Sequence, residues 1–240
     1  MNKKVIFFTS LTALIVTSVL FILMQAKQPS HLTLRFQATV DNNPLVLHHN
    51  SYANPGGEGL FTIRDFQFFI SNIKLIGKKN NFREVESYHL VRFDNEDNFY
   101  EIVLPNIIIE DYQQIELGVG VDPDANGTIT ISGDLDPNGR MAWSWDVGYK
   151  FLLLEGSLLH HQQQIPLVYH IGFNESYTRV SFPLNEAIKT DNSLINFNVE
   201  LLHLFNREIP IDLSELSTVK FDTENVALIS EGFKDLIKLK

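Results

Sequence analysis

The chain has 240 residues, of which 44% are hydrophobic and 20% are charged. This is the composition of a folded domain, and it is too apolar for a disordered one. The net charge of −10 argues against a general nucleic-acid binder, and the absence of cysteine excludes disulfides and Cys-ligated metal centres.

Residues 1–28 are predicted to be a targeting segment. Lys3 and Lys4 precede an apolar run without charged residues over residues 5–26, which is long enough to span a bilayer. Met24 makes the stretch before Lys27 a poor cleavage site, which favours an uncleaved membrane anchor over a cleaved signal peptide. Both alternatives place the rest of the chain in an extracytoplasmic compartment, in the periplasm or on the outer face of the inner membrane.

Residues 29–240 are predicted to be one all-β domain. Apolar and polar residues alternate over residues 31–40, and further short strands, such as 145–154 and 194–204, follow at loop-separated intervals. This pattern is typical of an antiparallel β-sandwich. Helical spacing occurs only near the end, between residues 226 and 237, which predicts a short C-terminal helix.

No local catalytic motif is present, because the chain lacks G-x-S-x-G, H-E-x-x-H and a P-loop. We therefore expect a protein that is not an enzyme. Among the histidines, His170 stands out because it follows an apolar strand segment and precedes Ile171-Gly172, where it is suited to line a site. The alternative is a core histidine that bonds a carbonyl.

Two acidic loops share the pattern D-x-D-x-N-G twelve residues apart. Closely spaced side-chain oxygens beside a turn glycine suit calcium, although the glutamate that ends an EF-hand loop is missing. The alternative is a pair of plain Asx-type turns. The candidate calcium ligands are Asp122, Asp124, Asn126, Asp134, Asp136 and Asn138.

Residues 141–151 form the densest aromatic segment and contain both tryptophans, Trp143 and Trp145. In a strand these two rings would face the same way, and burial in a core between sheets is the simplest reason for them.

Several motifs, taken in order, resemble the MbnP-like copper-binding family, which occurs beside methanobactin and other copper-uptake genes. The aromatic strand F-Q-F-F-I-S-N at residues 66–72 and G-V-G-V-D at residues 118–122 match in order, as do E-G at residues 155–156 and Y-H-I-G at residues 169–172. The most specific match is M-A-W-S-W followed by G-Y-K-F, over residues 141–151. Together these matches extend from about residue 32 to residue 172.

The resemblance implies an extracytoplasmic β-sandwich that binds copper. In characterised relatives, a di-haem enzyme of the MauG type oxidises a tryptophan to kynurenine, whose amine joins histidine at the metal. Carried over to this chain, His170 is the best copper ligand, and Trp143 or Trp145 is the residue oxidised. The motifs do not identify a second histidine, for which the candidates are His48, His49 and His89. The alternative function is a calcium-stabilised or metal-free binding module that has lost the copper site.

Overall fold

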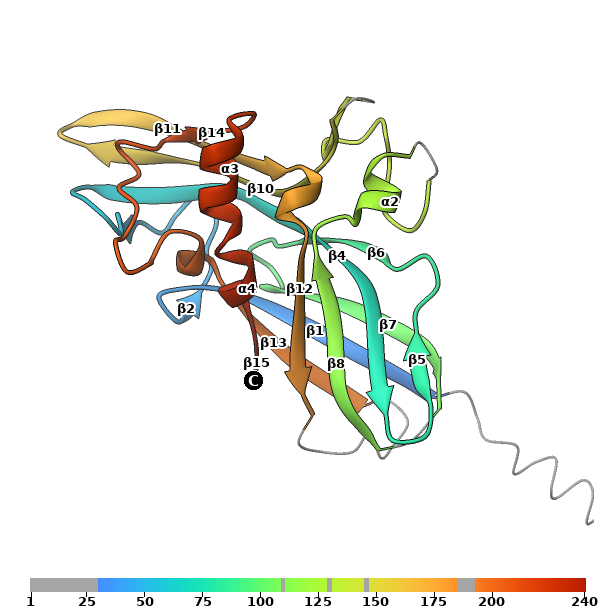
Figure 1. The fold of residues 1–240 in the computed structure, drawn as a ribbon. Coiled ribbons are helices and arrows are strands. Elements are labelled where there is room, and N and C mark those ends of the chain that lie inside the picture. The colour runs from blue at the N-terminus through green and yellow to red at the C-terminus, as the bar shows by residue number, and fades with distance from the viewer. Residues whose placement is uncertain (1–29, 109–110, 129–130, 145–146, 185–192) are drawn as a thin grey trace, which may run out of the picture.

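Two β-sheets that share one apolar core form the body of the molecule (Figure 1). The computed structural model describes residues 30–108, 111–128, 131–144, 147–184 and 193–240. Strands dominate these residues, and the helical segments are short. The predicted all-β sandwich with a short C-terminal helix is therefore confirmed.

The smaller sheet is built around the first strand. Its order is β15 (Ile237–Leu239), β13 (Ser193–Glu200), β1 (Ser30–Val40) and β2 (Asn43–Pro44), and β7 (Phe99–Ile107) also pairs with β1. The predicted alternation holds, because Leu32, Leu34 and Phe36 are fully buried. In contrast to the antiparallel expectation for neighbouring strands, β1 and β13 are parallel, and Phe36 stacks on its partner Phe197 with ring centroids 5.0 Å apart.

The larger sheet has ten strands among the described residues. Its main order is β12 (Thr178–Pro183), β8 (Tyr112–Val119), β4 (Leu60–Gly77), β10 (Gly148–His160), β11 (Gln163–Gly172) and β14 (Thr218–Val219). The short strands β3 (Tyr52–Ala53), β5 (Asn81–Arg83) and β6 (Tyr88–Arg92) pair with β4, and β9 (Ala142–Ser144) pairs with β10. The ladders are antiparallel except that of β11 with β14.

The long strand β4 changes direction at Asn72, which adopts a left-handed backbone conformation with φ 53°. The register with β8 shifts at this point, so Asn72 occupies an irregularity in the ladder. Its side-chain amide donates to Asp122 Oδ2 at 2.8 Å and to the Tyr177 hydroxyl at 3.1 Å. These two bonds connect the bend in β4 to loops far away in sequence and hold them together.

The segment predicted to be one short helix between residues 226 and 237 forms two helices, α3 (Thr223–Ser230) and α4 (Phe233–Leu236). Helix α3 begins earlier than predicted, and Ile237 belongs to strand β15. Asp222 caps α3 by accepting a hydrogen bond from the Asn225 amide at 2.8 Å. In Figure 1 the two helices follow one another from the region of β11 and β14 toward β12 and β13, and contacts with β11, β12 and β13 agree with this view. They therefore cover one side of the sandwich.

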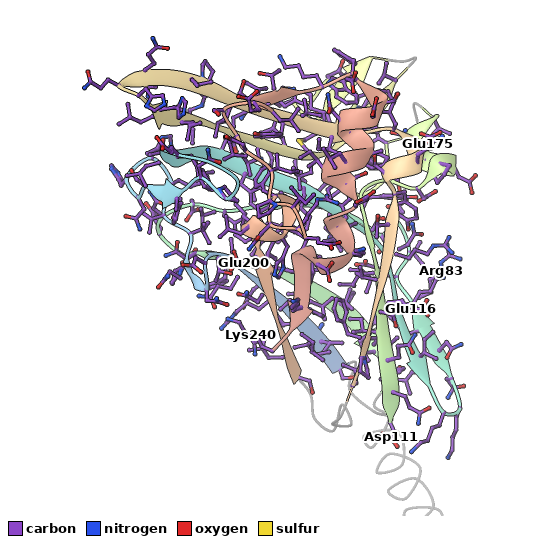
Figure 2. The ribbon with its side chains drawn as sticks, turned by 60° about the vertical axis from the view of Figure 1, so that its left-hand side comes forward. Arg83, Asp111, Glu116, Glu175, Glu200 and Lys240 are labelled. Atoms are coloured by element: carbon purple, nitrogen blue, oxygen red, sulfur yellow. The ribbon has the colours of Figure 1, made fainter. Side chains whose placement is uncertain are left out.

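Two of the predicted strands have different limits in the structure. In the segment predicted as 145–154, β10 begins at Gly148, whose φ of +84° favours glycine, and β9 ends before it. In the segment predicted as 194–204, β13 ends at Glu200 and a 3₁₀ turn η2 (Leu201–Leu204) follows. The buried Glu200 carboxylate, labelled in Figure 2, ends the strand because it accepts bonds from the amides of Leu202, Asp41 and Asn42.

The predicted targeting segment lies outside the described residues. Within the part of the chain that the structure describes, no helix is long and apolar enough to cross a membrane.

Candidate functional site

Strand β11 brings His170 to the face of the larger sheet opposite to its core-facing neighbours. Tyr169 and Ile171 are fully buried, and His170 alternates with them. The Nε2 atom of His170 lies 2.9 Å from Oε1 of Glu155 on β10, and the two side chains are 13% and 12% exposed. A largely buried imidazole is thus held by a carboxylate.

Glu155 is the centre of an ion network that joins three elements. Its Oε2 atom accepts hydrogen bonds from Nη2 of Arg64 and from Nη2 of Arg140, each at 2.7 Å. Arg140 also pairs with Asp65 on β4. Burial by itself raises the pKa of Glu155, but the bonds from Arg64 and His170 and the charge of Arg140 outweigh burial and lower the pKa to about 2. Glu155 is therefore ionised at neutral pH.

Two lysines add positive charge beside His170. Lys150 is 8% exposed and its Nζ atom donates to the Arg140 carbonyl at 2.6 Å. Burial lowers the pKa of His170, and the charges of Lys150 and Lys220 lower it further, whereas Glu155 acts in the opposite direction. The imidazole is consequently neutral and able to act as a ligand near pH 7.

The ring of Trp143, on β9, covers the same face of β11 at Gly172, two residues beyond His170. A Cβ atom added at Gly172 would lie 2.7 Å from Cζ3 of Trp143, so the indole occupies the space of the absent side chain. The ring also packs against Phe173 and Phe221, with centroids 5.4 and 5.1 Å away, and Phe221 is 60% exposed. The structure therefore brings Trp143 and His170 to one face, while Trp145 lies outside the described residues.

The first acidic loop is a capped helical turn. Asp122 caps α2 (Pro123–Asn126) by accepting hydrogen bonds from the amides of Asp124 and Ala125. Its other oxygen accepts from Asn72 and, at 2.6 Å, from the Tyr88 hydroxyl. Burial opposes ionisation of Asp122, but these four bonds outweigh burial and lower its pKa. The carboxylate is already satisfied by protein donors.

Three of the remaining candidate calcium ligands, Asn126, Asp134 and Asp136, are also engaged. Asn126 Oδ1 accepts from the Tyr149 amide at 2.8 Å, and its amide group donates to Asn174. In the second loop, Asp134 accepts from the Leu90 amide, and Asp136 accepts from the amide of Asn138, which is the bond of an Asx turn. The geometry of both loops favours the plain-turn alternative.

The three other candidate histidines occupy separate settings. His89 Nε2 lies 2.8 Å from Glu84 Oε2, in a pair like that of His170 and Glu155. His48 and His49 are exposed in a turn, where His48 borders a groove of about 380 Å³ beside Arg64. Among the described residues, no group of three His, Cys, Asp or Glu side chains is arranged to hold a metal ion.

The charged partners of His170, and the structural reason for a glycine at position 172, were not predicted from the sequence. Glu155 belongs to the E-G motif and Lys150 to the G-Y-K-F motif, so the motifs contained a signal for both. Arg64 and Arg140 lie outside those motifs, and they meet Glu155 through the pairing of β4 with β10 and the chain before β9. Gly172 is explained by the close approach of the Tyr149 carbonyl oxygen and of the Trp143 ring, which would lie 2.6 and 2.7 Å from an added Cβ atom.

Comparison with known proteins bears on the family and the fold of the chain. The model of the MbnP family matches residues 29–224. The solved structure of MbnP from Methylosinus trichosporium superposes with a TM-score of 0.52 at 15% sequence identity, covering 74% of this chain and 78% of that one. A search of curated proteins found no match. The structural likeness, at this identity, bears on the fold.

Proposed function

Because the chain belongs to the MbnP family, we propose that it is an exported, non-enzymatic copper-binding protein whose site forms between His170 and a nitrogen derived from Trp143. The observation that carries this proposal is that both side chains lie on one face of β11. His170 belongs to this strand, and the ring of Trp143, which comes from β9, lies over Gly172, two positions further along. A neutral imidazole is a good ligand for either oxidation state of copper.

The encoded side chains by themselves supply an incomplete site. In the described residues His170 offers one imidazole, and the indole of Trp143 offers an N–H donor without a lone pair for a metal. Oxidation to kynurenine would cleave the C2–C3 bond of the indole, add two oxygen atoms and, after hydrolysis, release the C2 carbon as formate. Two equivalents of peroxide, each reduced to water with the help of a partner di-haem enzyme of the MauG type, would supply the oxygen atoms, and the product would carry a free aromatic amine.

The charge around His170 supports a second candidate, a metal-free binding module of the same fold. Arg64, Arg140, Lys150 and Lys220 all lie close to the Glu155–His170 pair, and Glu155 is shared between two of them. An excess of positive charge repels a copper ion. Because the oxygens of the acidic loops are engaged, calcium stabilisation receives less support from the geometry.

Copper titration separates the two candidates. Protein isolated from its native host should bind copper more tightly than protein made without the oxidising partner, and mass mapping of the peptide with residues 141–150 should find oxidised tryptophan in the native material. The substitution His170→Ala should lower the affinity, whereas His160→Ala, on the distant hairpin between β10 and β11, should leave it unchanged. Equal affinity in folded wild type and His170→Ala would remove His170 from the site and favour the metal-free candidate.

Export is the second part of the proposal, and the apolar run at residues 5–26 behind Lys3 and Lys4 supports it. A reporter fused after Lys240 should be active outside the cytoplasm. Intact-mass analysis then distinguishes an uncleaved membrane anchor from a cleaved signal peptide. A fusion that works only in the cytoplasm would contradict export.

A further inference from the structure

A histidine can present either ring nitrogen to a ligand, and the hydrogen bond made by the other nitrogen decides which one. In this structure Nε2 of His170 faces Glu155 Oε1 at 2.9 Å, and both side chains are largely buried. Within the described residues, Nδ1 of His170 has no hydrogen-bond partner. The two nitrogens therefore have unequal roles.

The network around Glu155 determines which atom of the pair carries the proton. Oε2 of Glu155 accepts from two guanidinium groups, those of Arg64 and Arg140, at 2.7 Å each. A carboxylate held by two cations in this way is an acceptor at both oxygens. The proton between Glu155 and His170 must then belong to Nε2 of the imidazole.

We propose that Glu155 is the positioning residue of the His170 site: it holds the Nε2–H tautomer and leaves Nδ1 as the nitrogen with the free lone pair. Arg64 and Arg140 support this role because they fix the carboxylate on the side of Oε2. Lys150 directs its ammonium to the Arg140 carbonyl, and so does not compete for Oε1 of Glu155. The tautomer is a property of the copper-free protein, whereas its use in metal binding rests on the proposed function.

A purely structural role for Glu155 makes a different prediction. In that case the carboxylate would only tie Arg64 on β4 and Arg140 to β10, and its removal would lower stability without changing the state of the imidazole. The two roles are separated by a spectrum of the ring nitrogens, because folding stability alone does not alter nitrogen chemical shifts in the folded protein.

The experiment is long-range ¹H–¹⁵N correlation spectroscopy of the histidine rings in copper-free protein at pH 8, with His170 assigned from His170→Gln. Wild type should show the Nε2–H tautomer. Glu155→Ala should give a mixture of both tautomers. Glu155→Gln, which serves if the alanine variant does not fold, should favour Nδ1–H, because its amide oxygen faces the guanidinium groups of Arg64 and Arg140 and its NH2 group donates to Nε2 of His170. An Nδ1–H tautomer in wild type, or an unchanged tautomer in folded Glu155→Ala, would overturn the proposal.

The chain supplies a matched control in the His89–Glu84 pair, whose Nε2–Oε2 distance is 2.8 Å. Glu84→Ala should change the signals of His89 and leave those of His170 as they are. If Glu84→Ala changes the ring-nitrogen signals of His170 as much as Glu155→Ala does, the change is not specific to Glu155. The positioning role proposed for Glu155 then fails.

A second measurement links the tautomer to the metal. Loss of a carboxylate that orients a ligating histidine lowers metal affinity by roughly 10- to 100-fold, so native-form Glu155→Ala should bind copper more weakly by this factor. Wild type that binds no copper would remove the proposed function, while the nitrogen spectra would still decide the role of Glu155. The two failures are therefore distinguishable.

Discussion

The ion network at Glu155 predicts a specific dependence of stability on pH. The pKa of this carboxyl is about 2 in the folded protein against an ordinary value of 4.5. Ionised Glu155 therefore contributes about 3 kcal/mol to the free energy of unfolding, at roughly 1.4 kcal/mol per pKa unit. Because the folded pKa is depressed, this contribution is fully present above pH 4.5 and is lost as the pH falls through 2.

Urea unfolding of wild type and Glu155→Gln at several pH values tests this reasoning. The difference in unfolding free energy between wild type and Glu155→Gln should be larger at pH 7 than near pH 2 by about 3 kcal/mol. At pH 3, about 1 kcal/mol of this stabilisation by ionised Glu155 should remain. Glu101→Gln is the control, because its ion pair with Arg35 is about one third exposed and should contribute less than about 1 kcal/mol. A difference that is the same at pH 7 and pH 2.5 would refute the role assigned to the network.

Three further predictions follow from hydrogen bonds and close contacts. Millimolar calcium, compared with chelator, should leave the melting temperature unchanged, because Asp122 already accepts four bonds; a rise of several degrees in calcium-free protein would show a site. Asn72→Ala should lower the free energy of unfolding by about 1–3 kcal/mol in urea, since it leaves the partly buried carboxylate of Asp122 short of a donor and a left-handed position without asparagine; no loss would mean that the bend is held by other contacts. Gly172→Ala should displace Trp143 and shift its fluorescence emission to the red, whereas Gly127→Ala, where the nearest atom lies 3.6 Å from the new Cβ, should not; equal spectra would contradict the packing of the indole on β11.

The strands were predictable because their pattern is local. Alternation at residues 31–40 gave β1 within one residue, and helical spacing after Asp222 predicted the C-terminal helices. The parallel pairing of β1 with β13 was not predictable, because Leu32 and Ser193 meet through the whole fold and neither segment carries a local sign of its partner. The early end of β13 depends on where the Glu200 side chain finds donors, which is also a tertiary effect.

The candidate site shows the same division between local and distant information. His170 and Trp143 follow from motifs and strand periodicity. The state of His170 depends on Arg64, which reaches Glu155 across 91 positions of sequence. For the acidic loops, spacing suggested a group of oxygens, but the donors that satisfy Asp122 come from Asn72 and Tyr88, 50 and 34 positions away. Whether an oxygen is available to a metal is decided by such distant donors.

The central place of β1 in the smaller sheet governs the order in which the chain can fold. β1 is the first strand of the described chain to leave the ribosome, yet one of its neighbours, β13, begins only at Ser193. Until that segment arrives, an apolar strand with an open edge is available to other chains, which is a route to aggregation. Pairing across so long a loop is also slow to form. A chain of this topology therefore gains from protection of β1 during synthesis, and it completes its sandwich only after its C-terminal strands are free.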